Sequence, residues 1–358
     1  MKAMALRAEK RHSRHESGAT VVSIRDVALR ANVSIGTVSK YLNTPHRVAP
    51  DTKKRIGKAI KDLGYVRNEA ARQLRAGESR TLAVVALELN NPFFGDVADA
   101  MERRAAQNGL FLFIVSSNGD PEREGQYIEM FAQQRVYGVI LASGMTRERE
   151  LDLLLKRRIP TVLVDAYSKT DRFSSTSVDD FLGAERAVTH LIEQGCRSIA
   201  FIGGEIQIHQ IAERLRGARS AVAAHPGVRL EVIPTVERSV HAGIGAGQQL
   251  LGRPSKNRPD GVFAANDSLA IGIMQAISAG SDIRIPDDIA VVGYDDIDFA
   301  SSAAVPLSTV RRPREVFGRS AVDLVRDQAE SSEALPVRSI VIQPELIVRQ
   351  SSRRPRLA

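Results

Sequence analysis

The chain has 358 residues, 43% of them hydrophobic, and a formal net charge of +8. This length suits two or three domains, and the hydrophobic content is enough to bury a core, which excludes general disorder. No stretch approaches the ~20 apolar residues of a membrane-spanning helix, and the N-terminus has no apolar run typical of a secretory signal. Because Cys196 is the single cysteine, no intrachain disulfide can form, and a reducing cytoplasm is the expected location.

The charge is unevenly distributed along the chain. Residues 1–80 hold 18 Lys and Arg against 7 Asp and Glu, a net of +11, which leaves −3 for residues 81–358. A basic head on a mildly acidic body indicates that the head meets a polyanion, although charge alone also fits a solvated tail. Residues 1–22 are expected to form a disordered basic tail.

Three short helices are predicted between residues 23 and 64. Ser23 and Asp26 form the Ser-x-x-Asp pattern of a capping box, and apolar residues follow at helical spacing. A second helix should begin after Ser34, and a third should begin at Pro50 and end at Gly64. The side chains expected to pack between these helices are Ile24, Val27, Ala28, Ala31, Val38, Tyr41, Leu42, Ile56, Ala59, Ile60 and Leu63.

This pattern predicts a helix-turn-helix DNA-binding domain over residues 23–68, whose second helix enters the major groove. Short hydroxyl side chains let that helix approach DNA closely and bond phosphates, while lysine and arginine release counterions. The candidate contacts of these types are Ser34, Thr37, Ser39, Lys40 and Arg47. The pattern is moderately specific, because helical hairpins in unrelated proteins can look the same.

Residues 69–80 are expected to form a hinge helix or linker. The stretch EAARQLRA has a helical composition but lacks an apolar face that would stabilise an isolated helix. It should therefore fold only when something braces it.

From residue 81 the chain alternates apolar strands with helices, and the series restarts after Asp180. Near-continuous apolar strands between helices indicate parallel, doubly wound sheets, and the restart indicates two of them. We expect an α/β body over residues 81–358 with two lobes. The first lobe should span about 81–179 and 309–335, and the second about 180–308 and 336–352.

Polar residues follow several of these strands, at the ends where ligands of such sheets bind. They are Asn91, Asn118, Asp165, Asn266, Asp267, Asp295 and Asp296. Carboxylates and amides that face each other across two lobes suit a polyhydroxylated small molecule. The alternative is that each side chain caps the next helix, and for Asn118 and Asp267 the two interpretations are balanced.

Residues 23–80 resemble the DNA-binding head and hinge of the lactose-repressor (LacI/GalR) family of bacterial transcription regulators. The matching motifs are DVA, VSIGTVSKYLN, V-x-P-x-T at Val48–Thr52, LGY followed by Asn68, and A-x-x-L ending at Leu74. The resemblance implies that Leu74 wedges into the minor groove. It also implies base contacts at Ile35, Gly36 and Lys40, and further DNA contacts at Asn43 and Asn68. Arg67 stands where the family usually has proline.

Ile35 and Gly36 offer almost no hydrogen bonding to bases, so Lys40 should carry most of the hydrogen-bonded reading in the major groove.

The resemblance continues to about residue 350 through NPFF, VYGVIL, RLRGA, ANDSLAIG and VVGYDD. It implies two lobes of the periplasmic-binding-protein type with an effector between them. With the strand-end residues, the expected effector contacts are Asn91, Phe93, Phe94, Asp165, Arg214, Arg238, Asn266 and Asp295. Arg238 stands where relatives often have an aromatic residue. A second arginine beside Arg214 favours an anionic effector, such as a sugar acid or sugar phosphate.

The sequence carries no catalytic constellation. Its seven histidines are scattered without metal-ligand spacing, and no nucleophile elbow or phosphate-binding loop occurs. The GIGAG run at Gly243–Gly247 resembles a dinucleotide loop but lies at a helix start with the wrong spacing, which favours close helix packing. We expect neither an enzyme nor a bound cofactor or metal. A sugar-binding solute protein is the alternative, but it would need export.

These observations predict a ligand-responsive, sequence-specific DNA-binding regulator, with repression as the usual mode. Two copies should pair through their bodies, because one helix-turn-helix domain reads only half of a pseudo-palindromic operator. A sugar-like effector would change DNA affinity by its different affinities for two states. The C-terminal stretch SSRRPRLA has no leucine heptads, so a homodimer is expected, associated with the nucleoid when bound to DNA.

Replacing Leu74 by alanine tests the expected minor-groove wedge. The variant should bind its specific operator roughly tenfold more weakly, because the kinked and better-wrapped DNA loses its wedge. Non-specific binding depends on phosphate charge and should change little. Titrations of operator and random duplexes at one salt concentration measure both affinities. An equal loss on both duplexes would make Leu74 an ordinary linker residue.

Overall fold

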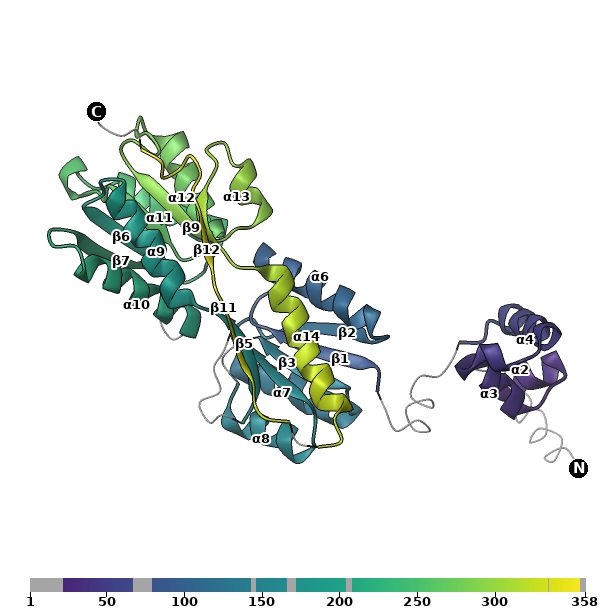
Figure 1. Cartoon of the computed structure of the whole chain (residues 1–358). Helices are drawn as coiled ribbons and strands as arrows, with labels where there is room; N and C mark the ends of the chain where they lie inside the picture. Colours follow the sequence, from purple (N-terminus) through teal and green to yellow (C-terminus); the bar gives the residue numbers. More distant parts are fainter. Residues whose placement is uncertain are drawn as a thin grey trace, which may run out of the picture. The chain divides into compact units, whose positions relative to one another are not determined.

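The computed structural model describes residues 22–66, 79–142, 146–165, 172–203, 208–333 and 335–354. The chain divides into two compact units, residues 1–77 and 78–358 (Figure 1). The predicted tail up to residue 21 and the hinge residues Arg67, Asn68 and Leu74 lie outside the described residues.

Residues 22–66 fold into the three predicted helices, α2 (Ile24–Ala31), α3 (Ile35–Asn43) and α4 (Pro50–Leu63), with a 3-10 turn, η1 (Pro45–Arg47). The capping box is confirmed: the Ser23 side chain accepts from Asp26 N, and the Asp26 carboxylate accepts from Ser23 N at 2.8 Å. Ser34 Oγ caps α3 by accepting from Thr37 N at 3.1 Å. The fully buried centre consists of Val27, Val38 and Ile56.

The first lobe of the body is a parallel sheet in the order β11-β5-β4-β3-β1-β2. Its strands are β1 (Thr81–Ala86), β2 (Phe111–Ser116), β3 (Gly138–Ala142), β4 (Thr161–Val164), β5 (Ser174–Val178) and β11 (Ser339–Ile342). Helices α6 (Pro92–Gln107) and α14 (Arg314–Glu330) cover one face. Helices α7 (Pro121–Gln134) and α8 (Glu148–Lys156) cover the other.

Alternate residues of β1 fill the two cores of this lobe. Leu82 and Val84 pack with α6 and α14, whereas Ala83 and Val85 pack with α7 and α8. Burial on both faces explains why β1 reads as a continuous apolar run.

The second lobe has the order β12-β10-β9-β8-β6-β7, with β12 antiparallel to β10. Its strands are β6 (Ser198–Gly203), β7 (Arg229–Pro234), β8 (Gly261–Ala264), β9 (Ala290–Asp295), β10 (Ser308–Arg311) and β12 (Glu345–Ile347). Its helices are α9 (Asp180–Glu193), α10 (His209–Ala223), α11 (Val240–Leu251), α12 (Asp267–Gly280) and α13 (Asp298–Ser302), with a 3-10 turn, η2 (Ser255–Asn257). The two doubly wound sheets are as predicted.

Helices α11 and α12 pack with their backbones close together. A Cβ atom on Gly243 would lie 2.3 Å from the carbonyl oxygen of Leu269, and one on Gly247 would lie 2.7 Å from the Ala276 side chain. The GIGAG run is therefore a helix-packing feature, as its position at a helix start indicates.

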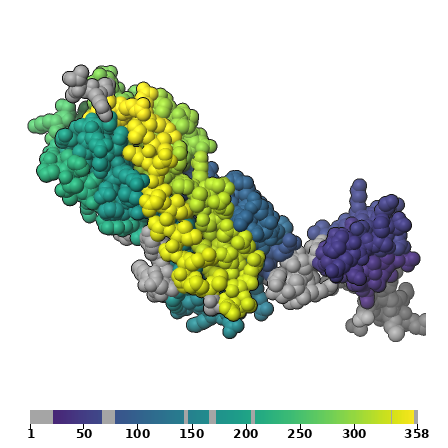
Figure 2. Space-filling model, in the orientation of Figure 1, coloured from purple at the N-terminus to yellow at the C-terminus, as the bar shows by residue number. Residues whose placement is uncertain are grey.

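Within the described residues, three segments pass between the lobes: β5 to α9, β10 to α14, and β11 to β12. The first lies where predicted, but the other two expected boundaries are wrong. Residues 309–311 pair with β9 in the second sheet, and residues 339–342 pair with β5 in the first. Both strands are short and begin with a polar serine (STVR and SIVI), so no clear apolar run marks them in the sequence. Figure 2 shows the yellow C-terminal part of the chain running over both lobes.

No helix in the described part of the chain combines the length and apolar character needed to cross a membrane.

Candidate functional site

The exposed face of α3 carries the residues expected to read bases. Ile35 is 41% exposed, and Gly36 and Lys40 are also exposed, whereas Val38 on the opposite face is buried. The polar side chains of this helix are held by neighbours: Ser34 Oγ lies 2.8 Å from Thr37 Oγ1, and Asn43 Nδ2 donates to the Ser39 carbonyl at 2.9 Å. Arg47 lies at the end of η1 and is exposed.

The same unit is strongly basic. Residues 22–66 contain nine Lys and Arg and three Asp, a net of +6. Most of the basic side chains are exposed, among them Lys54, Arg55, Lys58 and Lys61 of α4. An exposed helix with small and apolar tips, surrounded by positive charge, suits a groove lined by phosphates.

Seven of the eight predicted effector residues line one small cavity between the lobes of the body. They are Asn91, Phe94, Asp165, Arg214, Arg238, Asn266 and Asp295. Phe93 lies behind this lining and is fully buried, with its ring centre 3.9 Å from the guanidinium carbon of Arg312. The cavity has a volume of about 30 Å³, which holds about one water molecule.

These side chains also hold the lobes to each other. Asn91 Nδ2, from the first lobe, donates to Asp295 Oδ2 of the second at 3.3 Å. Arg312, in the segment between β10 and α14, pairs with Asp165 of the first lobe and lies 3.4 Å from Asp295 Oδ1 of the second. The residues that line the cavity are therefore the residues that connect the lobes.

Among the charged residues that line the cavity, Arg312 and Glu88 were not predicted. Glu88 lies two residues beyond β1 and pairs with Arg238 across the cleft at 3.0 Å. The apolar run of β1 continues to Leu89 in the sequence, so Glu88 looked like part of the strand. Arg312 directly follows β10, and the strand-end rule would have found it had that short strand been recognised.

Each arginine of the cavity is compensated by a carboxylate. Arg214 Nε donates to Asp180 Oδ1 at 2.9 Å, and its guanidinium lies 3.6 Å from the centre of the Tyr294 ring. Arg238 is compensated by Glu88. The expectation of an anionic effector depended on Arg238 being an additional cation, and this pairing removes its basis.

Burial and neighbouring charges shift the pKa values of Arg312 and Asp165. Burial alone would lower the pKa of Arg312, but the charges of Asp165, Asp180 and Asp295 raise it overall, so the guanidinium stays charged. Burial raises the pKa of Asp165, and the positive charge of Arg312 opposes that rise.

Asn91 and Asn266 each combine helix capping with a second contact at the cleft, which crosses between the lobes for Asn91 and stays within the second lobe for Asn266. Asn91 Oδ1 caps α6 by accepting from Phe93 N at 3.1 Å, which leaves its Nδ2 for Asp295. Asn266 Oδ1 caps α12 by accepting from Leu269 N at 2.9 Å, and its Nδ2 donates to the Arg238 carbonyl at 3.0 Å. Capping thus orients the amides toward the cavity.

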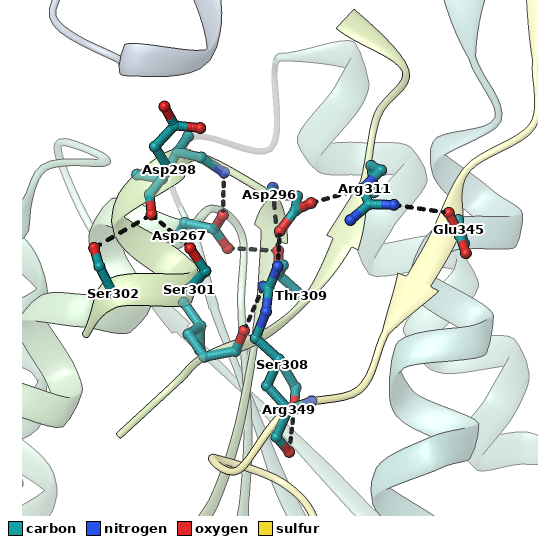
Figure 3. Close-up of polar contacts among 12 residues, drawn as sticks. Asp267, Asp296, Asp298, Ser301, Ser302, Ser308, Thr309, Arg311, Glu345 and Arg349 are labelled. Carbon is teal, nitrogen blue, oxygen red and sulfur yellow. Dashed lines mark hydrogen bonds and ion pairs between the residues drawn. The ribbon is translucent and has the colours of Figure 1, made fainter. Parts of the chain in front are cut away.

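The capping interpretation is wrong for Asn118 and Asp267, because Asp120 caps α7 and Asn266 caps α12. Asp267 is fully buried and accepts from Ile297 N at 2.9 Å and from Thr309 Oγ1 at 2.6 Å (Figure 3).

The carboxylate of Asp296, next to Asp295, pairs with Arg311 and with Arg349, each at 2.7 Å (Figure 3). Asp295 and Asp296 have φ angles of +112° and +57°. Positive φ is unfavourable for these residue types, so the network that includes Asp296 and Asp267 holds Asp295 in place at the end of β9.

Among the described residues, no group of three or more His, Cys, Asp or Glu side chains is arranged to hold a metal ion.

Comparisons with known proteins match both units. The family described as bacterial regulatory proteins, lacI family, matches residues 23–68, and the periplasmic binding protein-like domain matches residues 188–352. The repressor PurR of Aliivibrio fischeri is 31% identical over 336 residues, covering 92% of this chain and 98% of the relative. The ribose operon repressor of Escherichia coli is 32% identical over 311 residues, covering 85% and 92%.

The chain belongs to the lacI family of bacterial regulatory proteins. It is a transcriptional regulator and not an enzyme. Solved structures agree with this lacI-family assignment. The regulator CelR in complex with cellobiose is 31% identical with a TM-score of 0.67, covering 92% of this chain and 99% of that one. The lac repressor dimer bound to operator and an anti-inducer has the same fold. It is 24% identical with a TM-score of 0.79, covering 92% of this chain and 99% of that one.

Replacing Asp267 by asparagine tests the buried carboxyl of this lacI-family regulator. Burial, followed by the charge of Asp295, raises the pKa of Asp267 well above its usual 3.8. The folded chain therefore keeps a proton that the unfolded chain releases, and the wild-type free energy of unfolding falls as pH rises from about 4 through the raised pKa. Asparagine keeps the acceptor for Ile297 and does not titrate. Within that window the unfolding free energy of the variant, relative to wild type, should rise by up to about 1.4 kcal/mol per pH unit.

Urea denaturation at several pH values measures this difference. Asp298→Asn, which neutralises a carboxylate that is 84% exposed and pairs with Arg314 at the surface, is the control for the loss of a negative charge. If the difference between Asp267→Asn and wild type stayed constant through the window, the proposed titration of Asp267 would be wrong.

Proposed function

We propose that this protein is a sugar-responsive repressor that acts in the cytoplasm as a homodimer on a pseudo-palindromic operator. The head supports DNA binding through its basic charge and the exposed face of α3 with Ile35, Gly36 and Lys40. In this proposal Asn68 adds a DNA contact, and Leu74 of the hinge wedges into the minor groove. Both PurR of Aliivibrio fischeri and the ribose operon protein of Escherichia coli are repressors, which supports repression as the mode.

The observation that carries the proposal is that the cavity residues connect the lobes. A bound molecule that hydrogen-bonds Asp295 or Asn91 must replace or bridge their mutual contact. Its binding energy therefore differs between arrangements of the lobes, which is the requirement for a ligand to shift a conformational equilibrium. The hinge residues precede β1 of the first lobe directly, so a change in that lobe reaches the DNA-binding segment.

A sugar is the effector class that the cleft favours. The cavity of about 30 Å³ continues into a hollow of about 540 Å³ that shares Leu87, Glu88, Ile208 and Arg238 with it. Ligand sites for small molecules are typically ~300–1,000 Å³. Carboxylates and guanidiniums side by side offer acceptors and donors to vicinal hydroxyls. Among the relatives, one is a ribose operon repressor and one was solved with cellobiose.

Exposed aromatic side chains support pairing of two bodies. Phe111 and Phe113 lie on the edge strand β2 and are 65% and 48% exposed, and Phe299 of α13 is 62% exposed. Edge strands and exposed apolar side chains are favoured places for association. The lac repressor, which shares the fold, was solved as a dimer on its operator.

Selection of DNA from random duplexes tests the proposal. The full chain should enrich a palindromic site, because two heads related by twofold symmetry read two half-sites. Repeating the binding with pooled neutral sugars should change the affinity for that site about fivefold or more. Failure to enrich any palindrome would contradict the dimeric operator. An enriched site whose affinity no sugar changes would contradict the effector class.

A further inference from the structure

Glu88 and Arg238 stand where the hollows of the interlobe cleft meet. Arg238 lines the cavity of about 30 Å³, the hollow of about 540 Å³, and a third, mostly apolar hollow of about 440 Å³. Glu88 lines the first two. A molecule that extends from the cavity into either hollow therefore passes this ion pair.

The ion pair is anchored and shielded from water. The Glu88 and Arg238 side chains are 18% and 11% exposed, and their charged atoms lie 3.0 Å apart. The Arg238 backbone is fixed because its carbonyl accepts from Asn266 Nδ2 at 3.0 Å, and Asn266 is itself buried at the start of α12. Solvent screens such a pair much less than it screens a surface salt bridge.

Each charged side chain that lines the cavity has a partner of opposite charge. Glu88, Asp165 and Asp295 face three guanidiniums, those of Arg214, Arg238 and Arg312. Arg312 pairs with two of the carboxylates, Arg238 with the third, and Arg214 with Asp180. An added charge of either sign must displace one partner and leave it buried without compensation, which is strongly unfavourable. Hydroxyl groups donate to carboxylates and accept from guanidiniums without that penalty.

We propose that the Glu88–Arg238 ion pair is a charge filter that restricts the effector to neutral polyhydroxylated molecules and excludes sugar acids, sugar phosphates and amino sugars. The filter rests on the proposed effector function of the cleft. The two residues exclude opposite charges. Glu88 occupies Arg238, which would otherwise attract anions, and Arg238 occupies Glu88, which would otherwise attract cations. Removal of one half should therefore admit the charge that the other half attracts.

Matched ligand sets on the full-length chain test the filter. One set is glucose, glucuronic acid, glucose 6-phosphate and glucosamine, and parallel sets start from galactose and from ribose. Isothermal titration measures the affinity of each compound. In the set whose neutral sugar binds, the wild type should bind the charged members at least about tenfold more weakly than the neutral one.

Single substitutions should switch the preference in opposite directions. Glu88→Gln should strengthen binding of the sugar acid and sugar phosphate about tenfold or more and leave the amino sugar weak. Arg238→Gln should strengthen the amino sugar and leave the anions weak. The double variant should strengthen neither class. Glu102→Gln is the control for the loss of one negative charge, because Glu102 is exposed on α6 of the same lobe and lines none of the three hollows.

The outcomes separate the filter from the function on which it rests. Neutral and charged members that bind the wild type equally would overturn the filter and leave the effector function intact. So would a Glu88→Gln variant that shifts all members alike, or a Glu102→Gln variant that shifts them as Glu88→Gln does. Binding of no member of any set to the wild type would overturn the sugar-effector function itself.

Discussion

The buried guanidinium of Arg312 joins the two lobes of the body through carboxylates that end strands of different sheets. It pairs with Asp165 after β4 and with Asp295 at the end of β9, and the rings of Phe93 and Phe317 pack against it. A guanidinium in this position cannot lose both carboxylates without a large desolvation penalty. The arrangement of the two lobes therefore depends on these polar contacts in the cleft. A molecule that binds there and replaces one of them changes which arrangement is favoured.

Two neutral residues of the cleft also have two structural roles each. Asn91 and Asn266 cap helices with the oxygen of the amide, and the nitrogen donates to Asp295 of the other lobe and to the Arg238 carbonyl of the same lobe, respectively. The helices α6 and α12 thus begin at the cleft because their caps are cleft residues. A ligand that replaces the contact of either amide nitrogen leaves the cap in place, so the lobes can move as rigid bodies while each keeps its own fold.

Much of the fold and of the cleft followed from local sequence patterns. Helix caps such as Ser23 and Ser34 and the strand-end position of Asp165 and Asp295 are local features, and the structure has them where the sequence indicates.

What local patterns could not provide was the pairing between distant residues. Glu88 and Arg238 lie far apart in the sequence and in different lobes, and only the packed structure makes them partners. Glu88 was left out of the hypothesis of an anionic effector for this reason, because an arginine read from the sequence has no visible counter-charge. The short strands β10 and β11 were missed because each begins with a polar serine and lacks a long apolar run, and the position of Arg312 was missed with them.

The central claim is that ligand binding in the cleft and DNA binding by the head are coupled through the cross-lobe contacts. Thermodynamic linkage tests it most directly, with four dissociation constants: operator with and without a saturating sugar, and the sugar with and without saturating operator. The account predicts that both pairs change by the same factor, about fivefold or more. A sugar that binds in the cleft while both factors equal one would contradict it.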